Sequence, residues 1–253
     1  MQRPFDLVLF DLGSTLIYFD APWPEVMAAG YADLYHSLRA SGAELPRGRF
    51  IADFHERLST YYRERDTEFI EYTTESVLTR LVEEYIPGGL PQPVVRAALD
   101  ALYAVTQTHW ILEEDAHACL DALRAQGYAL GLVSNAGDSA DVHNLLEKAG
   151  LCPYFPEIII SADFGYRKPH PRIFEIALQA CGSSADRAVM VGDTLGADVL
   201  GARNAGLASI WITRRADTPD NRDHLDTIQP DARVETLLEI PEILNKWKKK
   251  PAG

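Results

Sequence analysis

The chain has 253 residues, of which 47% are hydrophobic and 24% are charged. This length and composition are typical of a soluble globular protein, and they exclude a disordered chain, a collagen-like fibre and a disulfide-stabilised miniprotein. The formal net charge is −13, from 24 basic and 37 acidic residues. Because such a field repels phosphate, we expect no general binding to nucleic acid or to an anionic membrane surface.

The cysteines and the apolar runs give information on the cellular compartment of the protein. The three cysteines, Cys119, Cys152 and Cys181, are widely spaced and form no Cys-x-x-Cys pair. This argues against a disulfide framework or structural zinc and fits a reducing compartment. The sequence contains no uninterrupted run of 18 apolar residues, so it predicts no membrane span. Asp6 and Asp11 interrupt the apolar start of the chain, which therefore does not resemble a signal peptide. We therefore predict a cytoplasmic protein.

The predicted elements fall into three parts along the chain. The first is a short buried strand over residues 5–10, which ends at Asp11. From about residue 22 to 108 the apolar pattern has helical periodicity, and Gly and Pro residues divide it into four helices, near 22–40, 48–65, 73–85 and 92–108. Beyond about residue 112, strands and helices alternate, with strands near 128–133, 157–160, 188–191 and 208–212. This alternation predicts a parallel sheet with helices on both faces, interrupted by a helical insertion.

Polar residues follow four of the predicted strands. They are Asp11 after the first strand, Ser134 and Asn135 after the second, Lys168 after the third, and Asp193 and Asp198 after the fourth. Each alone has an ordinary explanation, as a helix cap or a solvated lysine. Because ligands bind beyond the carboxyl ends of parallel strands, the set as a whole indicates a shared site. Carboxylates there suit Mg²⁺, and the hydroxyl and ammonium groups suit a phosphate.

These residues lie in segments that resemble, in order, the four motifs of the haloacid dehalogenase-like hydrolase superfamily. The segments are Asp11-Leu12-Gly13-Ser14-Thr15-Leu16, Leu132-Val133-Ser134-Asn135, Lys168-Pro169-His170-Pro171 with Ile173-Phe174, and Gly192-Asp193-Thr194 with Asp198. The resemblance spans nearly the whole chain. It implies an α/β fold, with a Rossmann-like core over residues 1–17 and 112–253 and an inserted helical cap of the C1 type over residues 18–111. It also implies a Mg²⁺-dependent phosphatase of a small phosphorylated metabolite.

The resemblance assigns a role to each motif residue. Asp11 is implied as the nucleophile that forms an aspartyl-phosphate. The Mg²⁺ ligands are implied to be Asp11, the backbone carbonyl of Gly13, Asp193 and, directly or through water, Asp198. Ser134, Asn135 and Lys168 are implied to hold the phosphoryl oxygens, and Lys168 also neutralises the charge of the nucleophile.

Gly13 departs from the family pattern, which usually has a second Asp at this position as general acid and base. Loss of that group costs about 10²–10⁴-fold in rate. The chain therefore suggests either a slow phosphatase or one with a substitute group. Asp20, where the chain enters the cap, is the leading substitute and a candidate catalytic residue, ahead of Glu25 and His36.

The sequence leaves several alternatives open. Gly13 favours a non-catalytic or regulatory phosphate-binding protein as the second candidate. A metal-free haloacid dehalogenase is less favoured because it does not need both Asp193 and Asp198, and the insertion has no lysine for phosphonate chemistry. The arginines Arg57, Arg63 and Arg65 form either a solvated helix face or a substrate pocket. The substrate, and the choice between a monomer and a homodimer, stay undetermined.

Overall fold

The computed structural model describes residues 4–247, so both extreme ends of the predicted core lie outside the described residues. Its central feature is a six-stranded sheet in the order β5-β4-β1-β6-β7-β8, with every neighbouring pair parallel. The strands are β1 Leu7–Phe10, β4 Ala129–Ser134, β5 Glu157–Ile160, β6 Ala188–Gly192, β7 Ala208–Ile212 and β8 Ala232–Val234. The predicted α/β class and Rossmann-like sheet are therefore confirmed.

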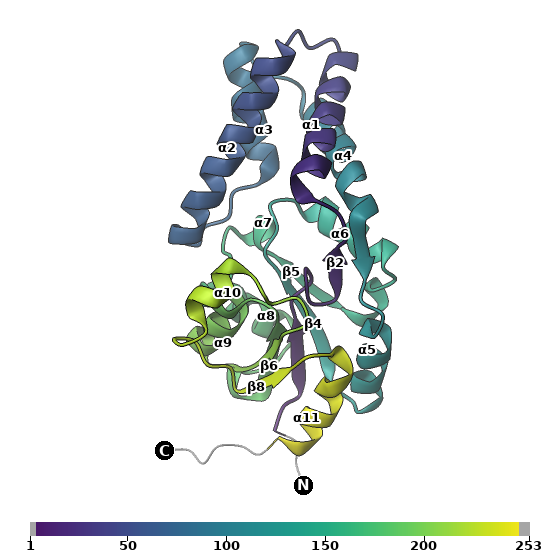
Figure 1. Cartoon of the computed structure of the whole chain (residues 1–253), viewed down its shortest axis with the longest axis vertical. Helices are drawn as coiled ribbons and strands as arrows, with labels where there is room; N and C mark the ends of the chain where they lie inside the picture. Colours follow the sequence, from purple (N-terminus) through teal and green to yellow (C-terminus); the bar gives the residue numbers. More distant parts are fainter. Residues whose placement is uncertain (1–3, 248–253) are drawn as a thin grey trace.

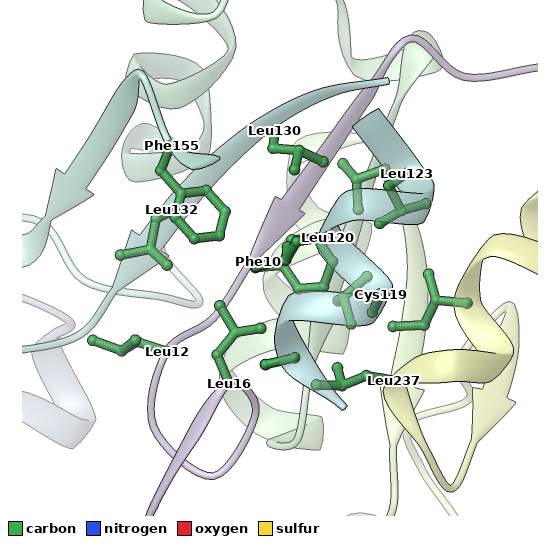
Figure 2. Packing of buried hydrophobic residues seen from close by; sticks show 14 of the residues in the cluster. Phe10, Leu12, Leu16, Cys119, Leu120, Leu123, Leu130, Leu132, Phe155 and Leu237 are labelled. Atoms are coloured by element: carbon green, nitrogen blue, oxygen red, sulfur yellow. The ribbon is translucent and has the colours of Figure 1, made fainter. Parts of the chain in front are cut away.

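Helices cover both faces of this sheet. β1 lies at its centre, and all four of its residues are buried, because alternate side chains enter two different apolar clusters. Val8 and Phe10 pack with α5 Ala116–Ala125, α6 Ser139–Lys148 and α11 Ile240–Lys246. Figure 2 shows Phe10 beside the leucines of α5. Leu7 and Leu9 pack on the other face with α8 Pro171–Ala180 and α9 Leu200–Ala205.

The shorter elements lie mainly in the connections of the core. They are α7 Ser161–Phe164, α10 Pro219–His224, the 3-10 turns η1 Gln107–His109, η2 Cys152–Tyr154, η3 Ala185–Arg187 and η5 Leu237–Glu239, and the π-helical turn η4 Leu195–Val199. Within residues 4–247, no helix combines the length and the apolar character that crossing a bilayer requires.

Four helices form the insertion, which extends beyond the carboxyl ends of the strands (Figure 1). They are α1 Trp23–Ala40, α2 Arg47–Glu68, α3 Thr74–Tyr85 and α4 Gln92–Thr106, each within a few residues of its predicted range. Their apolar faces form a separate buried cluster whose members, including Phe50, Phe54 and Leu78, all come from the insertion. The insertion therefore has a hydrophobic core of its own.

Backbone hydrogen bonds join the insertion to the core in two places. One is a two-stranded antiparallel ribbon of β2 Ile17–Phe19 and β3 Trp110–Leu112, which the sequence patterns did not reveal. The other is the loop before α3, where the backbone N–H of Glu71 donates to the carbonyl of Gly165 at 3.0 Å and that of Thr74 donates to Gly137 at 2.8 Å. The exact domain boundaries at residues 17/18 and 111/112 stay predictions.

Candidate active site

Asp11 stands at the carboxyl end of the central strand. Its backbone N–H donates to the carbonyl of Val191 at 2.9 Å, which extends the pairing of β1 with β6 by one residue. The chain then turns at once, because the N–H groups of Leu16 and Ile17 both return to the carbonyl of Leu12. This turn leaves the Asp11 carboxylate at the rim of the sheet, beneath the helical insertion.

Lys168 is the cation of the site. Its Nζ donates to Asp11 Oδ1 at 2.6 Å and lies 2.8 Å from Asp198 Oδ1, and the residue is only 2% exposed. Burial lowers the pKa of Lys168, but the charges of Asp11 and Asp198 outweigh that effect and raise it. The lysine is therefore a fixed positive charge beside Asp11.

Two further carboxylates follow β6 and complete the cluster. One oxygen from each of Asp11, Asp193 and Asp198 lies within 4.8 Å of the other two. Asp198 also accepts a hydrogen bond from the backbone N–H of Thr194 at 3.0 Å. Gly192 makes this arrangement possible, because a Cβ atom there would lie 2.2 Å from Asp198 Cγ. The sequence prediction that these residues share one rim is thus reproduced in the structure.

The cluster carries more negative than positive charge. Burial, then the charges of Asp11 and Asp198, raises the pKa of Asp193 well above its usual value. Burial also raises the pKa of Asp198 to about 6, although Lys168 opposes this. Three carboxylates with one ammonium therefore favour a second positive charge among them. Oxygen ligands in this number suit a hard divalent cation such as Mg²⁺.

A buried asparagine, which the sequence reasoning missed, holds the loop that carries Asp193. Asn221 of α10 is 2% exposed; its Nδ2 donates to the carbonyl of Asp193 at 2.9 Å, and its Oδ1 accepts from the N–H of Leu195 at 2.7 Å. The indole N–H of Trp211 donates to the same Asp193 carbonyl at 2.7 Å. The backbone on both sides of Thr194 is therefore fixed.

Ser134 and Asn135 both line the cleft, where they are predicted to bind a phosphoryl group. Asn135 also makes hydrogen bonds within the protein. Ser134 ends β4 and lines the cleft with Asp11. The side-chain amide of Asn135 is hydrogen-bonded to the backbone of Lys168 through both its oxygen and its nitrogen. That side chain is thus engaged in positioning the lysine. Direct contact of either residue with a phosphoryl group stays a prediction.

These groups open into a cleft of about 360 Å³ at the carboxyl ends of the strands, lined by residues of the core and by Trp110 of the ribbon. Its polar floor holds the carboxylate cluster, Lys168 and the predicted backbone ligand Gly13. Its apolar wall includes Ile17, Trp110, Val142 and Leu145. Two charged residues that the sequence reasoning did not single out, Asp141 and Arg167, also line it. A site of this volume, with few convergent polar groups, fits a small-molecule ligand.

The proposed substitutes for the missing second Asp lie outside this cleft. The Asp20 side chain is 42% exposed and pairs with His109 Nδ1 at 3.1 Å on the hinge ribbon. Glu25 is exposed, and His36 lies on the outer face of α1, 3.8 Å from Asp33. None of the three is among the described residues that line the cleft. The geometry therefore gives no support to Asp20 as the proton-transfer group.

The arginine cluster of α2 is also separate from the cleft. Arg57 pairs with Glu84 of α3, Arg63 donates to Thr60, and Arg65 stacks on Tyr62 with its Cζ 4.1 Å from the ring centre. Arg65 also lies 3.3 Å from the buried carboxylate of Glu71. In this conformation these arginines support the insertion.

A Rossmann-like sheet with an inserted helical cap and a carboxylate–lysine cluster at its rim defines a class of α/β hydrolases. A family model described as haloacid dehalogenase-like hydrolase matches residues 5–206. The chain belongs to this family, and the prediction of a hydrolase of this kind is confirmed.

Solved structures share the fold of this chain. A 2-haloacid dehalogenase from Pseudomonas syringae pv. Tomato DC3000 matches with a TM-score of 0.70 and 23% identity, over 96% of this chain and 100% of the other. A HAD phosphatase from Thermococcus onnurineus matches with a TM-score of 0.58 and 25% identity, over 95% and 98% of the two chains. The first of these likenesses concerns the fold alone.

The curated relatives are phosphatases. The chain is 37% identical to glyceraldehyde 3-phosphate phosphatase of Methanothermobacter thermautotrophicus over 48% of its length and 54% of the relative's. It is 34% identical to phosphoserine phosphatase of Thermus thermophilus, over 66% and 63% of the two lengths. It is 30% identical to ribulose-1,5-bisphosphate 5-phosphatase of Halopiger xanaduensis, over 94% and 98%. The first two matches thus span less than two thirds of each relative.

Proposed function

We propose that the protein is a Mg²⁺-dependent phosphatase that hydrolyses a phosphomonoester of a small metabolite through an aspartyl-phosphate on Asp11. The observation that carries the proposal is the contact between Asp11 and Lys168 at 2.6 Å, with Asp193 and Asp198 grouped around it at the floor of a cleft. The phosphatase activity of the curated relatives supports it. A cytoplasmic location and a monomeric or dimeric state stay predictions.

We assign the following catalytic roles to the residues of the cleft. Asp11 is the nucleophile, since it is the carboxylate at the end of the central strand and faces the open cleft. Lys168 orients Asp11 and offsets the charge of the phosphoryl oxygens, assisted by Ser134. Most of the rate enhancement in phosphoryl transfer comes from such positioning and charge stabilisation.

The three carboxylates and the Gly13 carbonyl would hold Mg²⁺. When bound, the ion would neutralise charge on the phosphoryl group and fix its orientation. The apolar wall that includes Ile17, Trp110, Val142 and Leu145 would contact the leaving group. Closure of the cap over the cleft would exclude bulk water. Phosphorylated three- to five-carbon metabolites, as named for the relatives, are the first substrates to test.

Two other functions fit part of the structure. Gly13 favours a phosphate-binding or regulatory protein that keeps the metal site without turnover. A haloacid dehalogenase shares the fold and the nucleophile. However, three carboxylates within 4.8 Å of one another favour a divalent cation, which a metal-free dehalogenase would not need.

The deciding experiment measures hydrolysis of p-nitrophenyl phosphate, glyceraldehyde 3-phosphate, phosphoserine and ribulose 1,5-bisphosphate with Mg²⁺ or with chelator. The parent is compared with Asp11→Asn and Asp193→Asn, and with Asp53→Asn of α2 as a control distant from the cleft. We expect Mg²⁺-dependent turnover that both site variants abolish and the control keeps. Mg²⁺ binding without turnover on any ester would favour the regulatory protein, and halide release from a 2-haloacid with chelator would favour the dehalogenase.

A further inference from the structure

Position 13, where the family usually has its acid–base carboxyl, faces an aromatic ring. A Cβ atom at Gly13 would lie 3.5 Å from Cη2 and 3.7 Å from Cζ3 of Trp110. The indole itself is held by Phe19, whose ring centre is 5.3 Å away in an edge-to-face contact. The space in front of Gly13 is therefore bounded by Trp110. A proton-transfer group must come from another wall of the cleft.

Asp141 supplies a carboxyl on such a wall. Four carboxyl residues line the cleft among the described residues, and three of them form the cluster around Lys168. Asp141 is the fourth; it lies in the first turn of α6, directly before Val142, which also lines the cleft. Its Oδ1 accepts a hydrogen bond from the side-chain amide of Gln107 at 2.8 Å, which fixes its orientation. It thus belongs to the cleft but not to the metal-binding group.

Burial brings the pKa of Asp141 close to neutral pH. Burial raises the pKa of Asp141 to about 7, and the charge of Asp138 adds to this, while the amide of Gln107 and the charges of Arg96 and Lys148 oppose it. Arg96 itself is paired with Asp138, 2.6 Å away. A carboxyl in this range exists in both protonation states at working pH, which general acid–base catalysis requires.

We propose that Asp141 is the general acid and base of the phosphatase reaction, in the role that Gly13 is unable to fill. This inference rests on the proposed function. In the first step Asp11 attacks phosphorus, the bond from phosphorus to the ester oxygen breaks, and that oxygen keeps the electron pair and takes the proton of Asp141. In the second step water attacks the aspartyl-phosphate and gives a proton to the Asp141 carboxylate. The bond between phosphorus and Asp11 then breaks, and inorganic phosphate leaves.

The test compares Asp141→Asn with Asp20→Asn, the substitution of the exposed hinge carboxyl. Asparagine keeps the oxygen that accepts from Gln107, so folding is preserved, and a melting curve checks this. Single-turnover rates are measured with p-nitrophenyl phosphate, whose leaving group needs no proton, and with glycerol 2-phosphate, whose leaving group does. The pH dependence of the glycerol 2-phosphate rate is recorded for all three proteins.

We expect Asp141→Asn to slow the glycerol 2-phosphate step by about 10²–10⁴-fold. Release of nitrophenol in the first turnover should change less than threefold, followed by accumulation of phosphoenzyme because its hydrolysis lacks a base. The parent rate with glycerol 2-phosphate should fall as the pH rises through about 7, and this decline should vanish in Asp141→Asn. Asp20→Asn should behave as the parent in every measurement.

Several results would overturn the inference while leaving the proposed function intact. They are an equal loss on both esters, no loss on either, an unchanged pH profile in Asp141→Asn, or a selective loss in Asp20→Asn. A parent that hydrolyses only the aryl ester would also overturn it, because such an enzyme has no working general acid. A parent without activity on either ester removes the proposed function and this inference together.

Discussion

Asn135 is hydrogen-bonded to both backbone polar groups of Lys168. Its Nδ2 donates to the Lys168 carbonyl at 2.9 Å, and its Oδ1 accepts from the Lys168 N–H at 2.8 Å. Asn135 follows β4, and Lys168 follows β5, so this pair of bonds ties together two loops at the rim of the sheet. The position of the buried ammonium group beside Asp11 therefore depends on a neighbouring side chain.

The first prediction concerns Asn135→Ala. Loss of two partly buried hydrogen bonds should lower the free energy of unfolding by about 1–3 kcal/mol. Displacement of the Lys168 ammonium should lower kcat by as much as about 10²-fold. Chemical denaturation and steady-state kinetics measure the two effects. Asn204→Ala is the matched control, since Asn204 reaches only the Pro169 carbonyl at 3.4 Å. A kcat equal to that of the parent would show that Asn135 does not position the lysine.

The second prediction concerns Gly192→Ala. The added Cβ would lie 2.2 Å from Asp198 Cγ, so the carboxylate or the strand has to move. Overpacking of this kind costs about 1–3 kcal/mol, and we expect lower stability together with weaker Mg²⁺ binding. Thermal unfolding and calorimetric titration with Mg²⁺ measure both. Gly196→Ala, whose Cβ would make only a 3.4 Å contact with His224, should leave both nearly unchanged.

The third prediction concerns the pH dependence of stabilisation by Mg²⁺. The raised pKa values of Asp193 and Asp198 mean that the folded protein without metal binds protons more tightly than the unfolded chain. This contribution is complete below the ordinary value of 3.8 and is lost as the pH rises through about 6 for Asp198. Mg²⁺ competes with these protons.

The increase in Tm on adding Mg²⁺ should therefore be larger at pH 7.5 than at pH 5.5, and differential scanning calorimetry measures it. Asp193→Asn should show little increase at either pH, because one of the proposed metal ligands is lost. Stabilisation that is equal at both values in the parent would mean that the cation does not bind among these carboxylates.

The fourth prediction concerns Asn221→Leu. Asn221 fixes the backbone of Asp193 and Leu195, so its loss should weaken Mg²⁺ binding by about 10–100-fold, as for other residues that orient metal ligands. Titration calorimetry without substrate separates this effect from catalysis. Asn144→Ala on the exposed face of α6 is the control. Unchanged affinity in Asn221→Leu would limit Asn221 to a role in folding.

The sequence was informative wherever the signal is local. Apolar runs and breakers identified the strands around Asp11 and Asp193 and the four helices of the insertion, because burial on both faces demands continuous apolar residues. The ordered motifs also indicated the carboxylate cluster with Lys168. The family, the sheet and the grouping of these side chains could be predicted on that basis.

The sequence was uninformative where a contact joins distant segments. Strands β2 and β3 have only three residues each, too few for a periodic pattern, and their pairing spans the whole insertion. Asp141 looks like any acidic residue that favours the first turn of a helix. Its place in the cleft depends on Gln107, which is far away in the chain. Asn221 could not be identified from the sequence either, because its role depends on its contact with the loop after β6.

The insertion is joined to the core in two physically different ways. At the ribbon, the chain itself links the insertion to the core, whereas near Glu71 the two are held together by non-covalent contacts. The buried carboxylate of Glu71 accepts a hydrogen bond from Ser161 Oγ at 2.8 Å and lies 3.6 Å from Arg167 Nε. Arg167 in turn lines the cleft. Through the Glu71 carboxylate, Arg167 therefore connects the cleft to the segment by which the insertion is held against the core without a covalent link.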